Sequence, residues 1–66
     1  MNTATVTPAA EARAALAFHN VKAYRVAYHL GCHPASLSLM LNGHRPMPEG
    51  LLERIKLAIA AEVEAK

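Results

Sequence analysis

The sequence has little of the material that several classes of protein need. Its 66 residues include one cysteine, one phenylalanine, two tyrosines and no tryptophan. A single cysteine excludes a framework of disulfide bonds within the chain and fits a reducing compartment. No apolar run approaches the length that crosses a bilayer, and no charged segment followed by an apolar stretch marks a signal peptide. We therefore expect a cytoplasmic protein that makes no contact with the membrane.

Acidic residues are missing from the middle of the chain. Between residues 12 and 48 there is no aspartate or glutamate, whereas all four histidines and four basic residues lie there: Arg13, Lys22, Arg25 and Arg45. Most of the acidic residues lie towards the C-terminal end: Glu49, Glu53, Glu62 and Glu64. The net charge is only +2, so the distribution is more informative than the sum. A basic or neutral face with an acidic far side favours binding to DNA.

Alanine, the best helix former, is abundant, and β-branched and aromatic residues are few, so we expect a small all-α domain. Residues 1–6 carry no pattern and are interpreted as a flexible N-terminal arm. Thr7 and Pro8 are typical of an N-cap and first helical position. The helix that they begin is predicted to run to about His19. Its expected buried stripe is Ala12, Ala15 and Leu16, with His19 as a further candidate and Phe18 at least partly buried.

Two short helices are predicted to meet at Gly31. The first spans roughly residues 21–30, with its apolar positions at helical spacing. Gly31 accepts the left-handed conformation that ends a helix, and Pro34 suits the first turn of the next, which runs to about residue 41. Asn42 and Gly43 end that second helix. Two helices joined by so tight a corner indicate a helix-turn-helix, with this core: Val26, Ala27, Leu30, Leu37 and Met40.

The residues on both sides of this corner resemble a known family. The run Val26-Ala27-Tyr28-His29-Leu30-Gly31-Cys32, followed by Leu37-Ser38-Leu39-Met40-Leu41-Asn42-Gly43, resembles the DNA-binding helix-turn-helix of the Cro and phage-repressor group. It is also similar to the headpiece of lac-repressor-type regulators. The resemblance covers roughly residues 21–60. It implies a compact lambda-repressor-like domain over residues 7–66, with four or five helices and its motif at residues 23–43.

The resemblance also implies which residues contact the bases of double-stranded DNA. In such folds the second motif helix lies in the major groove. The matching positions are His33, Pro34, Ala35, Ser36, Ser38 and Leu39. This stretch departs from the family pattern, because no arginine, lysine, glutamine or asparagine stands at its exposed start. Either apolar contacts, water and DNA shape supply the discrimination, or the motif binds a protein instead.

Phosphate contacts are expected on both flanks of the motif. Lys22, Tyr24 and Arg25 lie at the start of its first helix, an end that attracts anions. Gly43, His44 and Arg45 lie in the loop after its second helix, where the family touches phosphates, with the N–H groups of Gly43 and His44 as further donors. The alternative for each basic residue alone is a solvated surface charge.

Several choices stay open from the sequence. Asn20 either ends the first helix or caps the second, since Lys22 replaces the usual serine or threonine cap. A last helix from Pro48 has Leu51, Leu52, Ile55, Ala58, Ile59 and Val63 as its apolar face. Late in that helix, four residues either form a dimer surface or finish the core, which leaves a homodimer and a monomer as alternatives: Leu57, Ala60, Ala61 and Val63.

No metal, cofactor, small-molecule substrate or enzymatic activity is expected. His29, Cys32 and His33 lie close in sequence, but a structural zinc site needs four ligands, and Gly31 keeps the two histidines off one helical face. Cys32 is interpreted as a packed thiol, with a redox switch as the minor alternative. The predicted function is a small Cro-like repressor, of a phage or bacterium, that occupies an operator. The alternative is a protein-interaction module of antitoxin or anti-repressor type.

Overall fold

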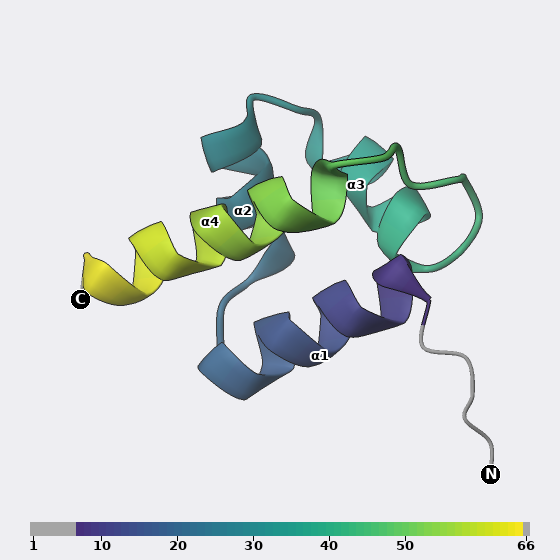
Figure 1. Ribbon diagram of the computed structural model, residues 1–66. Helices are drawn as coiled ribbons and strands as arrows, with labels where there is room; N and C mark the ends of the chain where they lie inside the picture. Colours follow the sequence, from purple (N-terminus) through teal and green to yellow (C-terminus); the bar gives the residue numbers. More distant parts are fainter. Residues whose placement is uncertain (1–6, 66) are drawn as a thin grey trace, which may run out of the picture.

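The computed structural model describes residues 7–65, and they form an all-helical domain with no strand (Figure 1). The helices are α1 (Pro8–His19), α2 (Ala23–Leu30), α3 (Pro34–Leu41) and α4 (Leu51–Glu64). The all-α prediction with four helices is therefore confirmed, and no fifth helix occurs between residues 7 and 65. The predicted N-terminal arm, residues 1–6, lies outside this part of the chain.

The N-terminus of α1 is capped as its sequence predicts. The Oγ1 atom of Thr7 accepts a hydrogen bond from the Ala10 N–H over 3.1 Å, and Pro8 takes the first helical position. Asn20 ends α1 in the left-handed conformation, with φ of 56°. This settles the open choice, because the N-cap of α2 is Lys22 and not Asn20. α2 consequently begins two residues later than expected, at Ala23.

A three-residue corner joins α2 to α3. Gly31 adopts φ of 71°, and the Cys32 N–H donates back to the Ala27 carbonyl over 3.1 Å, which closes the end of α2. α3 then begins at Pro34 as predicted. Cys32 is half-buried and packs against the core, in line with a packed thiol.

The start of α4 was predicted three residues too early. The chain forms a turn at Glu49 and Gly50, and Gly50 is the N-cap of α4 with φ of 87°, which only glycine adopts readily. The Leu51 N–H donates to the Pro48 carbonyl over 3.1 Å within this turn. Glu49 therefore lies outside the helix, while Glu53 lies in its first turn.

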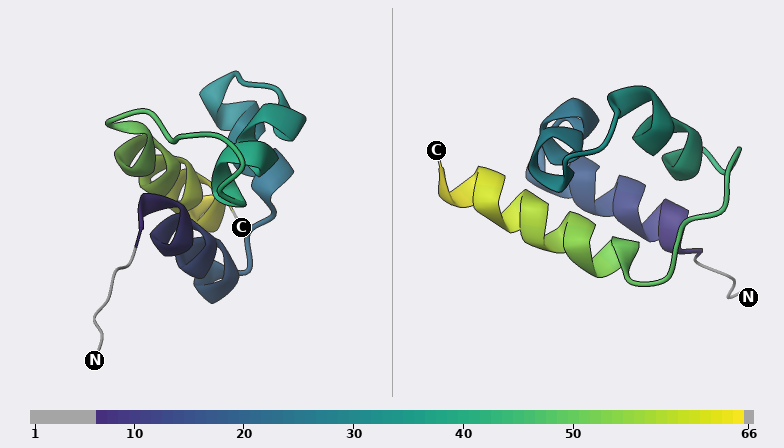
Figure 2. Two further views of the ribbon diagram at one scale, coloured as in Figure 1. Left: turned by 90° about the vertical axis from the view of Figure 1, so that its right-hand side faces the viewer. Right: turned by 90° about the horizontal axis from the view of Figure 1, so that it is seen from above.

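The two longer helices, α1 and α4, lie side by side and run in the same direction, and α2 and α3 pack across them (Figures 1 and 2). An ion pair of 2.7 Å between Lys56 Nζ and Glu11 Oε2 bridges α4 and α1. All four helices and the α1–α2 connection contribute to one core: Ala12, Leu16, Val21, Val26, Ala27, Leu37, Leu41, Leu51, Ile55, Ala58 and Ile59. The predicted core residues Leu30 and Met40 are only partly buried, and pack against it.

Some burial predictions were wrong. Phe18 is 84% exposed because it lies on the side of α1 opposite to Leu16, and His19 is also exposed. In α4, Val63 is 42% exposed, and the buried position next to it belongs to Glu62. The alternative that the last residues of α4 finish the core is also wrong, because the whole set is exposed: Leu57, Ala60, Ala61 and Val63.

Candidate nucleic-acid interface

The predicted base-contacting residues lie at the start and on the outer side of α3. His33 is the N-cap residue, and its Nδ1 accepts a hydrogen bond from the Ala35 N–H over 3.3 Å, which leaves Nε2 as the ring nitrogen for another contact. Pro34, Ala35 and Ser38 are exposed, and Leu39 is 39% exposed. The one departure is Ser36, which is half-buried and is the least accessible of the six predicted positions.

An asparagine that the sequence analysis treated only as a helix end lies beside this surface. The Nδ2 group of Asn42 donates to the Ser38 carbonyl over 2.9 Å and to Ser38 Oγ over 3.3 Å. The serine hydroxyl thus acts as an acceptor within the chain and keeps its proton for a further hydrogen bond. The signal in the sequence is the four-residue spacing of serine and asparagine on one helical face.

A shallow depression of about 410 Å³ connects α3 with the start of α2. Ser38 lines it from α3 and Asn42 from the C-cap of that helix, and Lys22 lines it from the N-cap of α2. Arg13 reaches it from α1, where its Nη1 donates to the Leu41 carbonyl over 2.9 Å. A predicted base contact and a predicted phosphate contact therefore share one hollow, with a second cationic side chain at its edge. Arg13 was not among the predicted contacts, although it belongs to the acid-free part of the sequence.

The start of α2 carries no side-chain cap. Thr7 and His33 cap α1 and α3, but Lys22 makes no such hydrogen bond at α2, so the first N–H groups of α2 are left without a side-chain acceptor. An uncapped helix N-terminus is favourable for an anion. Lys22 and Tyr24, at 59% exposure, lie at this end. Both retain the exposed positions that phosphate contact requires.

A carboxylate lies against the third predicted phosphate contact in α2. Glu62 of α4 is only 7% exposed, and its Oε1 lies 3.1 Å from Arg25 Nε. Its Oε2 lies 2.6 Å from His29 Nε2. The hydrogen bonds from Arg25 and then from His29 lower the pKa of Glu62 from its ordinary value. The same pairing raises the pKa of Arg25, so this guanidinium keeps its charge but already has an anionic partner.

This pairing corrects the predicted separation of charges. The sequence places Glu62 with the acidic C-terminal group, far from the basic segment. In the fold, α4 packs against α2 and brings that carboxylate to the start of the basic face. Arg25 therefore offers phosphate only the guanidinium atoms that Glu62 does not bind.

The loop after α3 keeps its side chains exposed but uses its backbone donors internally. Gly43 has φ of 80°, its N–H donates to the Met40 carbonyl, and the His44 N–H donates to the Leu39 carbonyl over 2.9 Å. These bonds close the end of α3. The prediction that both N–H groups are spare donors for phosphate was therefore wrong. The exposed His44 and Arg45 side chains are what this loop can offer.

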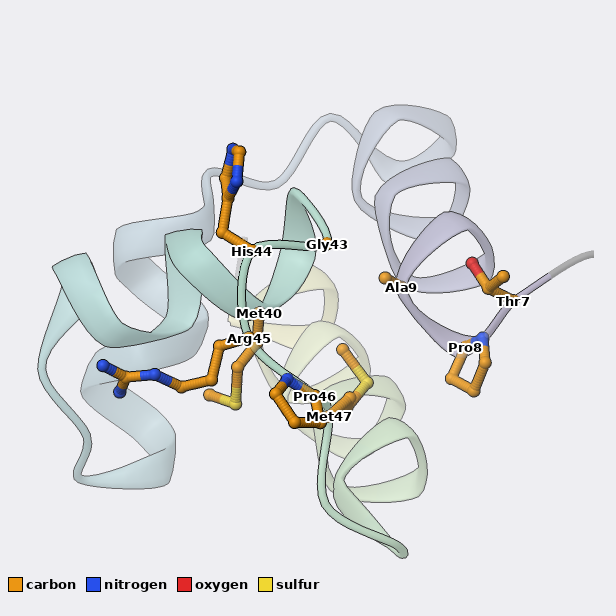
Figure 3. A pocket seen from close by; sticks show the side chains of 9 residues that line it. All are labelled: Thr7, Pro8, Ala9, Met40, Gly43, His44, Arg45, Pro46 and Met47. Carbon is orange, nitrogen blue, oxygen red and sulfur yellow. The ribbon is translucent and has the colours of Figure 1, made fainter.

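A cavity of about 320 Å³ lies between this loop and the start of α1. Figure 3 shows the imidazole of His44 and the guanidinium of Arg45 pointing away from the start of α1. The walls of the cavity are largely apolar, with Met40, Pro46 and Met47 on the loop side. The hydroxyl of Thr7 already accepts the Ala10 N–H as the cap of α1. The cavity therefore offers few polar groups for recognising a small molecule.

Comparison with protein-family models, with curated proteins and with solved structures finds no match to this chain. None of the helices within residues 7–65 is long and apolar enough to cross a membrane. Over the same residues, no three histidine, cysteine, aspartate or glutamate side chains gather where they could hold a metal ion.

Proposed function

We propose that this chain is a sequence-specific DNA-binding regulator of transcription that acts in the cytoplasm. In this proposal α2, the corner at residues 31–33 and α3 form a lambda-repressor-like helix-turn-helix, and α3 enters the major groove. The observation that carries it is the depression that places Lys22 beside Ser38 and Asn42. A cationic group and hydrogen-bonding groups on one surface suit a phosphate and a base edge on the same strand. A small regulator of this kind represses by occupying its operator.

Recognition of bases would depend on few hydrogen bonds. Ser38 Oγ, His33 Nε2 and the Asn42 amide are the polar groups near the exposed side of α3. Ala35 and Leu39 can contact thymine methyl groups. We therefore propose modest direct readout, supplemented by DNA shape.

Positioning on DNA would come from the flanks. Lys22 and Arg45 are exposed cationic side chains without an ion pair among the residues that the structure describes. Lys22 lies at the uncapped start of α2 and Arg45 lies beyond the end of α3. Lys22 and Arg45, together with Tyr24, Arg25 and His44, would contact the phosphates on either side of α3.

A second candidate is a helix-turn-helix module that binds a protein, of antitoxin or anti-repressor type. The exposed Leu39 next to Ala35 favours it, because an apolar helix face fits a protein groove as well as a thymine-rich DNA groove. Salt separates the two candidates. Phosphate binding releases counterions and weakens steeply as salt rises, whereas burial of an apolar patch does not.

The test is the anisotropy of a fluorescent random-sequence duplex over a salt series, with sequencing of the bound pool. Arg45→Ala should weaken binding to all sequences and flatten the salt dependence by about one unit of slope, whereas Ser38→Ala and His33→Ala should change the enriched sequence. Lys56→Ala is the matched control, because its exposed ion pair lies between α1 and α4. Absence of binding at low salt would overturn the proposal and favour the protein-binding candidate.

A further inference from the structure

An exposed seam on α4 is complementary to itself. Arg54, Leu57, Ala61 and Glu64 are all exposed and follow one another at spacings of three, four and three residues. This is the spacing of one face of a helix that packs against a second helix. Leu57 is 72% exposed and is the largest apolar side chain in this seam. The seam therefore has an apolar centre with a positive charge at one end and a negative charge at the other.

Three residues of this seam lie together on one shallow groove. Arg54, Leu57 and Ala61 line a shallow groove of about 270 Å³ between α4 and the end of α2. The small side chain of Ala61 leaves space on the helix surface, whereas the side chain of Leu57 protrudes. Within residues 7–65, neither Arg54 nor Glu64 has an ion-pair partner. The last turn of α4 also projects beyond α1 and α2 (Figures 1 and 2), so a second helix can approach it.

We infer that this seam binds a second copy of the chain, with the two α4 helices antiparallel. A two-fold axis level with position 59 places Arg54 of each copy opposite Glu64 of the other. It also places Leu57 of each copy opposite Ala61 of the other, so that a large side chain meets a small one. A two-fold interface needs a patch that complements itself in this way. A parallel pairing would instead place Arg54 opposite Arg54 and Glu64 opposite Glu64.

The dimer is expected to be weak. One helical face with a single large apolar residue buries less area than a standard stable interface, so its dissociation constant should be about micromolar or higher. The inference does not depend on DNA binding, because it concerns the free protein. Its test is therefore carried out without DNA, and its failure would leave the proposed function standing.

Charge reversal tests both the partner and the register. Sedimentation equilibrium is measured from about ten micromolar to about one millimolar protein, a range suited to a weak complex. Arg54→Glu or Glu64→Arg alone should raise the dissociation constant about tenfold by placing like charges opposite each other. The double variant should return it to the wild-type value, and an equimolar mixture of the two single variants should form heterodimers.

Leu57→Glu should weaken the dimer by about thirtyfold or more, and the chain should still fold because the side chain is exposed. Glu49→Arg is the matched control, since it reverses an exposed charge outside α4 and should leave dimerisation unchanged. A wild-type chain that stays monomeric at about one millimolar overturns the inference. If Leu57→Glu leaves dimerisation unchanged, the α4 seam is not the interface. If the double variant does not restore the affinity that each single charge reversal loses, the antiparallel register is wrong.

Discussion

Replacing Glu62 by glutamine should strengthen DNA binding at low salt. The buried carboxylate contacts Arg25 and His29, so it holds a negative charge against one of the proposed phosphate contacts. Glutamine keeps the shape and one acceptor oxygen but removes the charge. Arg25 would then be free to pair with phosphate, and the proposed interface would gain one positive charge.

The magnitude follows from the number of cationic side chains that are free to pair. Three of the predicted phosphate contacts are cationic side chains. If Glu62 already compensates Arg25, Lys22 and Arg45 remain among them, and two phosphate contacts give a slope of log affinity against log salt of about −1.8. With Arg25 released, three contacts give about −2.7. Between about 50 and about 200 mM salt, affinity should then fall about 12-fold for the wild type and about 40-fold for Glu62→Gln.

Fluorescence anisotropy over that salt range measures both slopes, and circular dichroism checks that each variant folds. Glu62→Asp retains the negative charge, so it is the control for a substitution at this buried position that does not remove the charge. In an Arg25→Ala background the Glu62→Gln change should no longer steepen the slope, because the released cation is absent. A slope that Glu62→Gln leaves unchanged, or that steepens equally without Arg25, would refute the reasoning.

The remaining predictions concern stability and are measured by urea unfolding. Pairing lowers the pKa of Glu62 below its ordinary value of 4.5, so the stabilisation from this carboxylate is present above that pH and is lost as the pH falls through the lowered pKa. The difference in the free energy of unfolding between wild type and Glu62→Gln should therefore shrink on acidification. A difference that stays constant with pH would contradict the pairing. Leu37→Ala, at a fully buried position, should cost about 2–5 kcal/mol, whereas Phe18→Ala should stay within about 0.5 kcal/mol because that ring is exposed. Thr7→Ala should cost about 1 kcal/mol by removing the cap of α1, and Thr7→Ser should restore it.

Helix ends were predictable because their causes are local. Thr7, Gly31 and Pro34 each act on backbone groups within four residues, and the structure places all three as the sequence predicts. The start of α4 was missed because two signals compete there. Pro48 suits a first helical position, but Gly50 takes a positive φ that the helix cannot include, so α4 begins only after it.

The environment of Glu62 was not predictable from periodicity. An apolar pattern along α4 fits Val63 at the edge of the buried face, and nothing nearby in sequence favours a buried carboxylate. Its burial depends on Arg25 and His29, which lie more than thirty residues earlier. The prediction that Phe18 is partly buried was wrong because it was based on residue type, and no second element covers that side of α1. Both errors concern tertiary packing, which a single sequence encodes only indirectly.

The small number of free cations links the two proposals. Of the three cationic side chains among the predicted phosphate contacts, Arg25 pairs with Glu62, which leaves Lys22 and Arg45. Two contacts per copy give only a shallow salt dependence, whereas two copies on a mirrored site would double the slope to about −3.6. The slope on the enriched site therefore counts the bound copies.

Disrupting the α4 seam should halve that slope without touching the proposed DNA surface. Leu57→Glu, measured on a mirrored site at a protein concentration that favours the dimer, should give a slope near −1.8, the value for one copy. Leu57 lies on α4, away from the depression between α2 and α3, so the affinity for a single half-site should change little. If Leu57→Glu retains the full slope, the two copies meet on DNA through another surface or bind independently, and the α4 seam has no part in recognition.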